Sequence, residues 1–194
     1  MKGLCLPTWT RAKIRPMNKR PPRLLDAEGL WSFALKVLGM RALTVAELRE
    51  KLRGRALEPS DVDGVMAKLG EYGYLNDVKF AESFATARRD NQGFGKRRVM
   101  MDLKQRRVAP QIAEQAIAQT FQGVDETVMI EQFLARKFRG KKLNEYLQVQ
   151  KNLAAAFRRL QYAGFSAGPA IQVLKRYAAQ ADELEPEEPV DPDA

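Results

Sequence analysis

Apolar residues recur at the spacing of an α-helix along most of the chain. The first set predicts an amphipathic helix that ends near Gly39, and it comprises Leu30, Phe33, Ala34, Val37 and Leu38. Thr44 is followed three residues later by Glu47, a capping-box pattern in which a hydroxyl and a carboxylate satisfy the unpaired N–H groups of a helix start. A further helix is expected to begin near Pro59. This part of the chain therefore predicts three successive helices.

The same layout returns twice further along the chain. In the first unit, the second helix contains Val45, Leu48 and Leu52, and the turn after it contains Leu57 and Pro59. The residues 51 positions later are Lys96, Val99, Leu103, Val108 and Pro110. A further 57 positions on, the last four recur as Ala156, Leu160, Phe165 and Ala167. A period of about 50 residues is typical of tandem structural units. Because residue identity between the units is low, an all-α chain without true repeats is the alternative.

These patterns predict an all-α fold of three tandem three-helix repeats, helix-turn-helix-like in plan, in an elongated and curved array. The expected repeats span residues 28–75, 76–122 and 123–180. Ahead of them, residues 1–27 combine basic residues with prolines, and we expect a flexible basic arm; a transit peptide and a true start at Met17 are the alternatives. Residues 181–194 contain seven acidic residues and no basic one, which predicts a disordered tail.

A Gly-Phe-Gly turn, from Gly93 to Gly95, lies between two predicted helices of the middle repeat. Together with Lys96 it resembles part of a phosphate-binding P-loop. The P-loop pattern, however, requires a glycine where this chain has Asp90 and a serine or threonine where it has Arg97. The turn also follows a predicted helix instead of a strand. We therefore interpret it as a tight helix-to-helix turn in which glycine permits a positive φ angle.

The composition excludes several kinds of catalytic site. The chain has no histidine, which rules out His-based triads, HExxH zinc sites and an imidazole general base. Cys5 is the only cysteine, so an internal disulfide framework and a Cys-rich zinc cluster are excluded, and a reducing cytoplasm is compatible. Asp77, at a predicted helix start, is interpreted as a capping residue. We expect no enzyme activity, no metal, no cofactor, no membrane span and a cytoplasmic location.

The formal net charge is +9, and the basic residues are concentrated in the second and third repeats. Residues 76–122 contain nine basic and five acidic residues, and residues 123–180 contain ten and four. This distribution indicates a polyanionic partner, with a basic surface that serves only solubility as the alternative. The expected binding residues lie near helix junctions and are Arg88, Arg89, Lys96, Arg97, Arg98, Lys104, Arg106, Arg107, Arg136, Lys137, Arg139, Lys141, Lys142, Arg158 and Arg159.

The middle repeat resembles the central repeat of the RecX family, small bacterial proteins that regulate the RecA recombinase. The residues that carry this resemblance are Tyr74, Leu75, Asp77, Phe80, Ala81, Arg88, Gly93, Gly95 and Leu103. A looser resemblance extends from about Ala34 to about Tyr177. It implies a non-enzymatic regulator that binds the RecA filament on single-stranded DNA. Such a protein inhibits or modulates filament extension, ATP hydrolysis and strand exchange in recombination, repair and the SOS response.

The expected partners are therefore the RecA filament and DNA, bound weakly and without sequence preference, by a monomer that contacts no membrane. Single-stranded DNA is the first candidate and double-stranded DNA the second. The alternative function is that of a stand-alone helix-turn-helix transcription regulator. The predicted second helices carry Lys and Arg but few of the Asn, Gln or Ser residues that contact base edges. Phosphate or protein carboxylate is thus favoured as the target.

Overall fold

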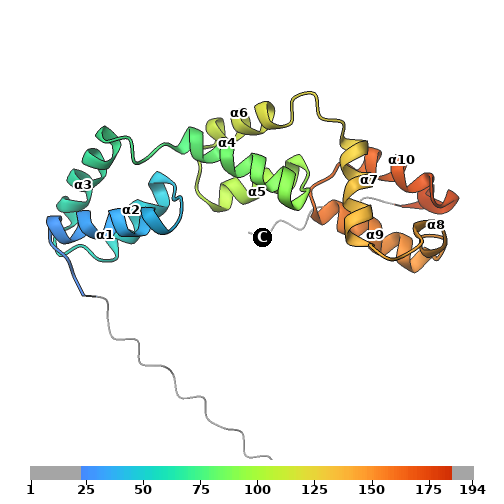
Figure 1. Ribbon diagram of the computed structural model, residues 1–194, viewed down its shortest axis with the longest axis horizontal. Helices are drawn as coiled ribbons and strands as arrows, with labels where there is room; N and C mark the ends of the chain where they lie inside the picture. The colour runs from blue at the N-terminus through green and yellow to red at the C-terminus, as the bar shows by residue number, and fades with distance from the viewer. Residues whose placement is uncertain (1–22, 185–194) are drawn as a thin grey trace, which may run out of the picture.

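The computed structural model describes residues 23–184 of the chain. Within this range the chain forms helices and no strand, apart from one isolated backbone bridge between Leu25 and Ala56. Figure 1 shows three helical bundles that follow one another in an elongated, gently curved row. The predicted all-α array of three-helix repeats is therefore confirmed. The predicted basic arm and acidic tail lie outside the described residues, except for residues 23–27 and 181–184.

The first bundle contains α1 (Ala27–Met40), α2 (Val45–Arg53) and α3 (Pro59–Glu71). The predicted capping box is present: the Thr44 hydroxyl accepts the N–H of Glu47 at 3.1 Å, and the Glu47 carboxylate accepts the N–H of Thr44 at 3.3 Å. Leu57, the repeated apolar position in the turn after the second helix, does not pack in the core, because its side chain is 57% exposed. Ala56, one residue earlier, packs against the core in its place.

The middle bundle contains α4 (Asp77–Ala87), α5 (Lys96–Gln105) and α6 (Pro110–Thr120). A π-helical turn, η1 (Arg88–Gln92), extends α4 up to the glycine corner. Gly93 ends this turn with a φ of 68°, in the left-handed region that glycine adopts without a steric penalty. Gly95, by contrast, has an ordinary φ of −76°. The prediction of positive φ is thus confirmed for the first glycine of the corner and wrong for the second.

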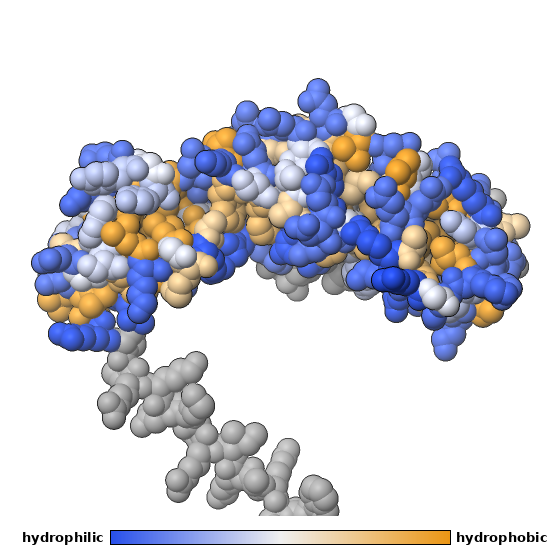
Figure 2. Space-filling model, viewed as in Figure 1, coloured by the Kyte–Doolittle hydropathy of each residue, from blue (hydrophilic) through white to orange (hydrophobic). Residues whose placement is uncertain are grey.

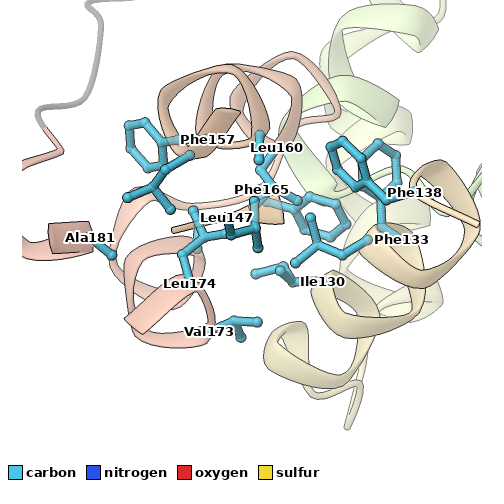
Figure 3. Close-up of a cluster of buried hydrophobic side chains, with 14 of the residues drawn as sticks. Ile130, Phe133, Phe138, Leu147, Phe157, Leu160, Phe165, Val173, Leu174 and Ala181 are labelled. Carbon is cyan, nitrogen blue, oxygen red and sulfur yellow. The ribbon is translucent and has the colours of Figure 1, made fainter. Parts of the chain in front are cut away.

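The third bundle contains α7 (Glu126–Lys137), α8 (Leu143–Tyr146), α9 (Gln150–Tyr162) and α10 (Ala167–Lys175), followed by a 3₁₀ turn, η2 (Ala179–Glu183). The short α8 follows the basic segment of Arg139, Lys141 and Lys142 that separates α7 from α9. Figure 3 shows its core, in which Phe133 and Phe165 meet edge to face at 5.6 Å. Ala181 is fully buried in the same core and Leu184 packs against it, so this bundle extends past the boundary expected at residue 180.

Side chains connect the first bundle to the middle one, at what we call the first junction. The Thr44 hydroxyl donates to the carbonyl of Arg106 at 2.8 Å. The Asp77 carboxylate accepts the N–H of Val45 at 2.9 Å. Asp77 is therefore a helix cap, as predicted, but it caps α2 of the neighbouring bundle, while Asn76 caps its own helix α4. The first junction thus consists largely of polar contacts that satisfy backbone groups across the two bundles.

Backbone atoms connect the middle bundle to the third, at the second junction. The N–H of Gly95 donates to the carbonyl of Ala163 at 2.8 Å, and the N–H of Arg97 donates to the carbonyl of Gly164 at 3.3 Å. A Cβ atom added to Gly95 would lie 2.4 Å from the carbonyl oxygen of Gly164. Phe94 packs against the cores of both bundles. The second junction therefore depends on two glycines that allow the backbones to touch.

Candidate nucleic-acid and protein interface

The buried carboxylate of Asp102 holds two of the predicted binding residues at the glycine corner. Its side chain is 5% exposed, and its oxygens lie 3.2 Å from Nε of Arg88 and 3.1 Å from Nε of Arg98. These contacts are ion pairs that lack hydrogen-bond alignment. The guanidinium group of Arg88 also stacks on Phe84 at 4.8 Å, and that of Arg98 stacks on Phe94 at 5.6 Å. Both positive charges are thus fixed in place and partly neutralised.

Arg89 is bound by protein groups on two sides. Its Nε donates to Oδ1 of Asp90 at 2.7 Å, and its Nη1 donates to the carbonyl of Thr120 at the end of α6. The hydrogen bond from Arg89 lowers the pKa of the Asp90 carboxyl below its usual range, and the same bond raises the pKa of the Arg89 guanidinium. Arg89 therefore connects η1 to α6, and its charge is offset by a neighbouring carboxylate.

Arg106 and Arg107 belong to the first junction. Nε of Arg106 lies 3.0 Å from a carboxylate oxygen of Glu47, and its Nη2 donates to the carbonyl of Ala42 at 3.2 Å. Arg107 pairs with Glu50 at 2.5 Å. The partners of both arginines lie in the first bundle, so these side chains connect two bundles across the junction. The structure does not group them with the other predicted binding residues.

Three predicted binding residues of α5 project from the middle bundle without an acidic partner. Lys96, Arg97 and Lys104 are all exposed. Arg97 and Lys104 are seven residues apart, about two helical turns, and therefore lie on nearly the same face of α5. None of the three side chains forms an ion pair with an acidic group among residues 23–184. We call these residues the open cations of α5, since their charges are available to an external anion.

Cations and aromatic rings alternate at one end of the third bundle. Nζ of Lys141 lies 3.9 Å from the ring centroid of Tyr146, and the guanidinium of Arg159 lies 5.4 Å from that of Phe138. The rings of Tyr146 and Phe138 are themselves 5.3 Å apart. The predicted residues from α9 and from the loop after α7 therefore converge. Each ring face holds one cation without neutralising its charge.

The remaining predicted residues of the third bundle have different surroundings. Lys137 lies over the ring of Phe133 at 5.7 Å, and Lys142 pairs with Glu145 at 3.0 Å on the surface. An exposed pair of this kind contributes little to stability, and the lysine remains accessible. Arg139 is exposed and pairs with no acidic residue in the described part of the chain. The third bundle therefore adds accessible positive charge to that of α5.

Arg136 crosses the second junction, where it lies between the open cations of α5 and the basic residues of the third bundle. Its Nη1 approaches the carbonyl oxygen of Asn91 at 3.5 Å, and its guanidinium fills the space beside Gly93, where a Cβ would lie 1.8 Å from Nη2. The glycine contacts of the same junction place the start of α5 beside the end of α9, which carries Arg158 and Arg159. In Figure 2 strongly hydrophilic residues gather where the middle and third bundles meet.

Asp102 is the residue that the sequence interpretation missed. It lies on α5 three residues after the core position Val99 and directly before the core position Leu103. A carboxylate on an apolar helix face, four residues after Arg98, is itself a signal for a buried ion pair. In the described part of the chain, no cluster of acidic or cysteine residues could hold a metal ion, and no helix has the length and apolar character needed to cross a bilayer.

The fold and this surface define an all-helical protein of tandem three-helix units with a basic outer face. A family model described as the second three-helix domain of RecX matches residues 76–117. The regulatory protein RecX of Vibrio parahaemolyticus is 32% identical over 149 residues, which cover 77% of this chain and 89% of that protein. The regulatory protein RecX of Mycobacteroides abscessus is 35% identical over 113 residues, covering 56% and 55% of the two chains.

A crystal structure of RecX from Lactobacillus salivarius has the same fold, with a TM-score of 0.59 at 18% identity, over 81% of this chain and 97% of that one. The match to the Vibrio protein covers most of both chains and exceeds 30% identity. The chain belongs to the RecX family of regulatory proteins.

Proposed function

We propose that this protein is a non-enzymatic regulator that binds the filament formed by the RecA recombinase on single-stranded DNA. In this role it inhibits or modulates filament extension, ATP hydrolysis and strand exchange. Membership of the RecX family supports the choice of partner. The elongated row of bundles in Figure 1 supports the mode of binding, because such a row can contact several successive subunits of a filament at once. The protein acts as a monomer in the cytoplasm.

The open cations of α5 carry this proposal. Lys96, Arg97 and Lys104 are exposed and pair with no carboxylate in the described residues. They can therefore neutralise phosphate groups without first breaking an internal contact. Each phosphate neutralised on a single strand adds about 0.7 to the slope of log affinity against log salt. Loss of three such contacts lowers the slope by about 2.

The test is the triple variant Lys96→Glu, Arg97→Glu and Lys104→Glu. Arg98 is left intact, because a glutamate in its place would face the buried carboxylate of Asp102 and destabilise the bundle. The measurement is the rate of ATP hydrolysis by purified recombinase on single-stranded DNA, together with the salt dependence of binding. We expect the wild-type protein to suppress hydrolysis and the variant to lose this effect, with unchanged helix content by circular dichroism.

A matched control changes the same number of charges on the first bundle: Lys36→Glu, Lys51→Glu and Arg53→Glu. All three residues are exposed. If the control loses suppression as fully as the α5 variant, overall charge and not the position of the open cations determines binding. Sequence-specific binding to duplex DNA without recombinase, combined with no effect on hydrolysis, would instead establish the transcription-regulator alternative and refute the proposal.

A further inference from the structure

Helix α1 presents a second apolar face in addition to the one that forms the core. Leu30, Ala34 and Val37 are buried in the first bundle. Trp31, Leu35 and Leu38 follow at positions i, i+4 and i+7, which places them on one side of the helix, and they are only partly buried. These three side chains pack against the edge of the core and leave part of their apolar surface exposed, where another molecule can pack.

This second face forms one wall of a groove of about 670 Å³ between the first and middle bundles. Leu35 and Leu38 of α1 lie on one side, and Phe80 and Phe84 of α4 lie on the other. The two phenylalanine rings are stacked, with centroids 5.7 Å apart and an interplanar angle of 20°. The groove is therefore lined by aliphatic side chains facing a pair of aromatic rings, a surface that suits aliphatic and aromatic side chains of a protein partner.

An exposed aromatic cluster continues the groove along α1. Tyr74 lines the groove and also meets Trp31, with ring centroids 6.4 Å apart. Tyr72 lies 5.8 Å from Trp31 and 6.3 Å from Tyr74. The two tyrosines are 63% and 53% exposed. Clusters of Trp and Tyr that remain this exposed are typical of the energetic centres of protein interfaces.

The lining of the groove carries one charge, which is positive, whereas the neighbouring pocket at Trp31 is lined by Glu28 and Asp61 as well as by Lys68. Lys79 is the only charged residue that lines it, and the lining includes no carboxylate. Lys68 lies 4.6 Å from the Trp31 ring centroid, and Arg106 lies 5.3 Å from that of Phe80. Arg106 is paired with Glu47, whereas neither lysine pairs with an acidic residue within residues 23–184. An occupant with carboxylates beside its apolar side chains therefore complements the groove in both shape and charge.

We propose that this groove binds an amphipathic, acidic helix of a protein partner, through apolar anchors between α1 and α4 and a carboxylate near Lys79. The inference rests on the proposed function, in which that partner is the recombinase, and it separates a protein-binding groove from the DNA-facing open cations of α5. Nucleic acid is a poorer occupant. Base stacking requires accessible ring faces along a positively charged groove that tracks the backbone, whereas four of the twelve lining residues are aliphatic and only one is a lysine.

The test compares two double variants with the same chemical changes. Tyr74→Ser with Lys79→Glu alters the groove, and Tyr162→Ser with Lys151→Glu makes matched changes at exposed positions of the third bundle. Fluorescence anisotropy measures the affinity of each full-length variant for the recombinase filament and for the same labelled strand without recombinase. We expect the groove variant to bind the filament at least about tenfold more weakly than the control, and the bare strand with the same affinity as the control.

Three outcomes overturn the inference. Equal filament affinities of the two variants show that the groove is not used. A loss of bare-strand affinity in the groove variant alone shows that nucleobases occupy it. A wild-type dimer in sedimentation that only the groove variant dissociates shows that a second copy of this chain covers it.

A second measurement keeps the groove testable if the wild-type protein binds no filament, a result that would refute the proposed function. Trp9 and Trp31 are the two tryptophans of the chain, so the tryptophan fluorescence of a Trp9→Phe variant comes from Trp31, which contacts the groove residue Tyr74. The probe is a synthetic amphipathic peptide with leucine anchors and glutamate flanks. We expect a saturable emission shift with this peptide, and none with a peptide in which lysine replaces glutamate. No shift, or equal shifts with both peptides, would overturn the inference.

Discussion

A methyl group added at Gly95 tests whether backbone contact holds the second junction together. Gly95 has a φ of −76°, a value that alanine adopts readily, so the substitution places no strain on its own backbone. The new Cβ, however, would lie 2.4 Å from the carbonyl oxygen of Gly164 and 2.6 Å from its carbonyl carbon. These are backbone atoms that cannot rotate away. The middle and third bundles must therefore separate at this point.

The separation costs the two hydrogen bonds of the junction, from Gly95 to Ala163 and from Arg97 to Gly164. At roughly 0.5–1.5 kcal/mol for each, Gly95→Ala should lower the free energy of unfolding by about 1–3 kcal/mol. Gly164→Ala should lower it further. Gly164 has a φ of 86°, which adds about 1–2 kcal/mol of backbone strain, and its Cβ would lie 2.2 Å from the nitrogen of Arg98.

Urea denaturation followed by circular dichroism measures the loss, and hydrogen exchange of the Arg97 amide locates it. The control is Gly64→Ala in α3, where a Cβ meets nothing within 4 Å. This variant should gain up to about 1 kcal/mol from the higher helix propensity of alanine. If Gly95→Ala were as stable as Gly64→Ala, or if it left the exchange rate of the Arg97 amide unchanged, close backbone contact would not be what joins the two bundles.

Two further predictions concern carboxylates. Asp102→Asn should lower the free energy of unfolding by about 2–3 kcal/mol in urea titrations, because two arginines lose a buried counter-charge. Both arginines are partly exposed, so solvent screening keeps the loss below that of a fully buried ion pair. Asp125 accepts hydrogen bonds from the hydroxyl and the N–H of Thr127, which hold the pKa of its carboxyl below the usual range. Since that pKa is depressed in the folded state, Asp125 stabilises the start of α7 above about pH 4, and this contribution is lost as the pH falls further. An NMR titration of the Thr127 amide measures the loss.

The control for Asp102→Asn is an exposed carboxylate on the neighbouring helix α6. Glu114→Gln on the exposed side of α6 removes a carboxylate that the structure gives no ion-pair partner, and it should leave stability unchanged within about 0.5 kcal/mol. An equal loss in Glu114→Gln and Asp102→Asn would contradict the role assigned to the buried carboxylate. For Asp125, a Thr127 amide whose shift follows an ordinary aspartate midpoint, or persists in Asp125→Asn, would contradict the capping argument.

The order of the main helices could be predicted because local rules determine it. The capping box at Thr44 and the left-handed Gly93 both depend on residues within a few positions of each other. Rules of this range fail where a residue distant in the sequence intervenes. Ser166 occupies the N-cap position of α10, where serine is favoured, but its hydroxyl accepts no capping hydrogen bond. Its N–H donates instead to the Glu126 carboxylate, 40 positions away in the sequence.

The candidate site shows the same division between local and distant determinants. The outward direction of Arg97 and Lys104 follows from helical spacing within α5. The surroundings of Arg106 could not be predicted in this way, because its partner Glu47 lies 59 positions earlier and meets it only when two bundles pack together. The burial of Asp102 is an intermediate case. Its position on the core face was visible in the apolar pattern, but the two arginines that pair with it come from different helical segments.

The two junctions between the bundles differ in the kind of contact that holds them, and we therefore expect them to differ in stiffness. At the first, charged pairs such as Glu50 with Arg107 are largely open to solvent, and dissolved ions screen them over about 10 Å at ordinary ionic strength. At the second, neutral amides meet across touching glycine backbones and are insensitive to such screening. We therefore expect rising salt to weaken the charged contacts of the first junction and to leave the amide contacts of the second unchanged. The angle between the first and middle bundles is then the part of the arc that salt can alter.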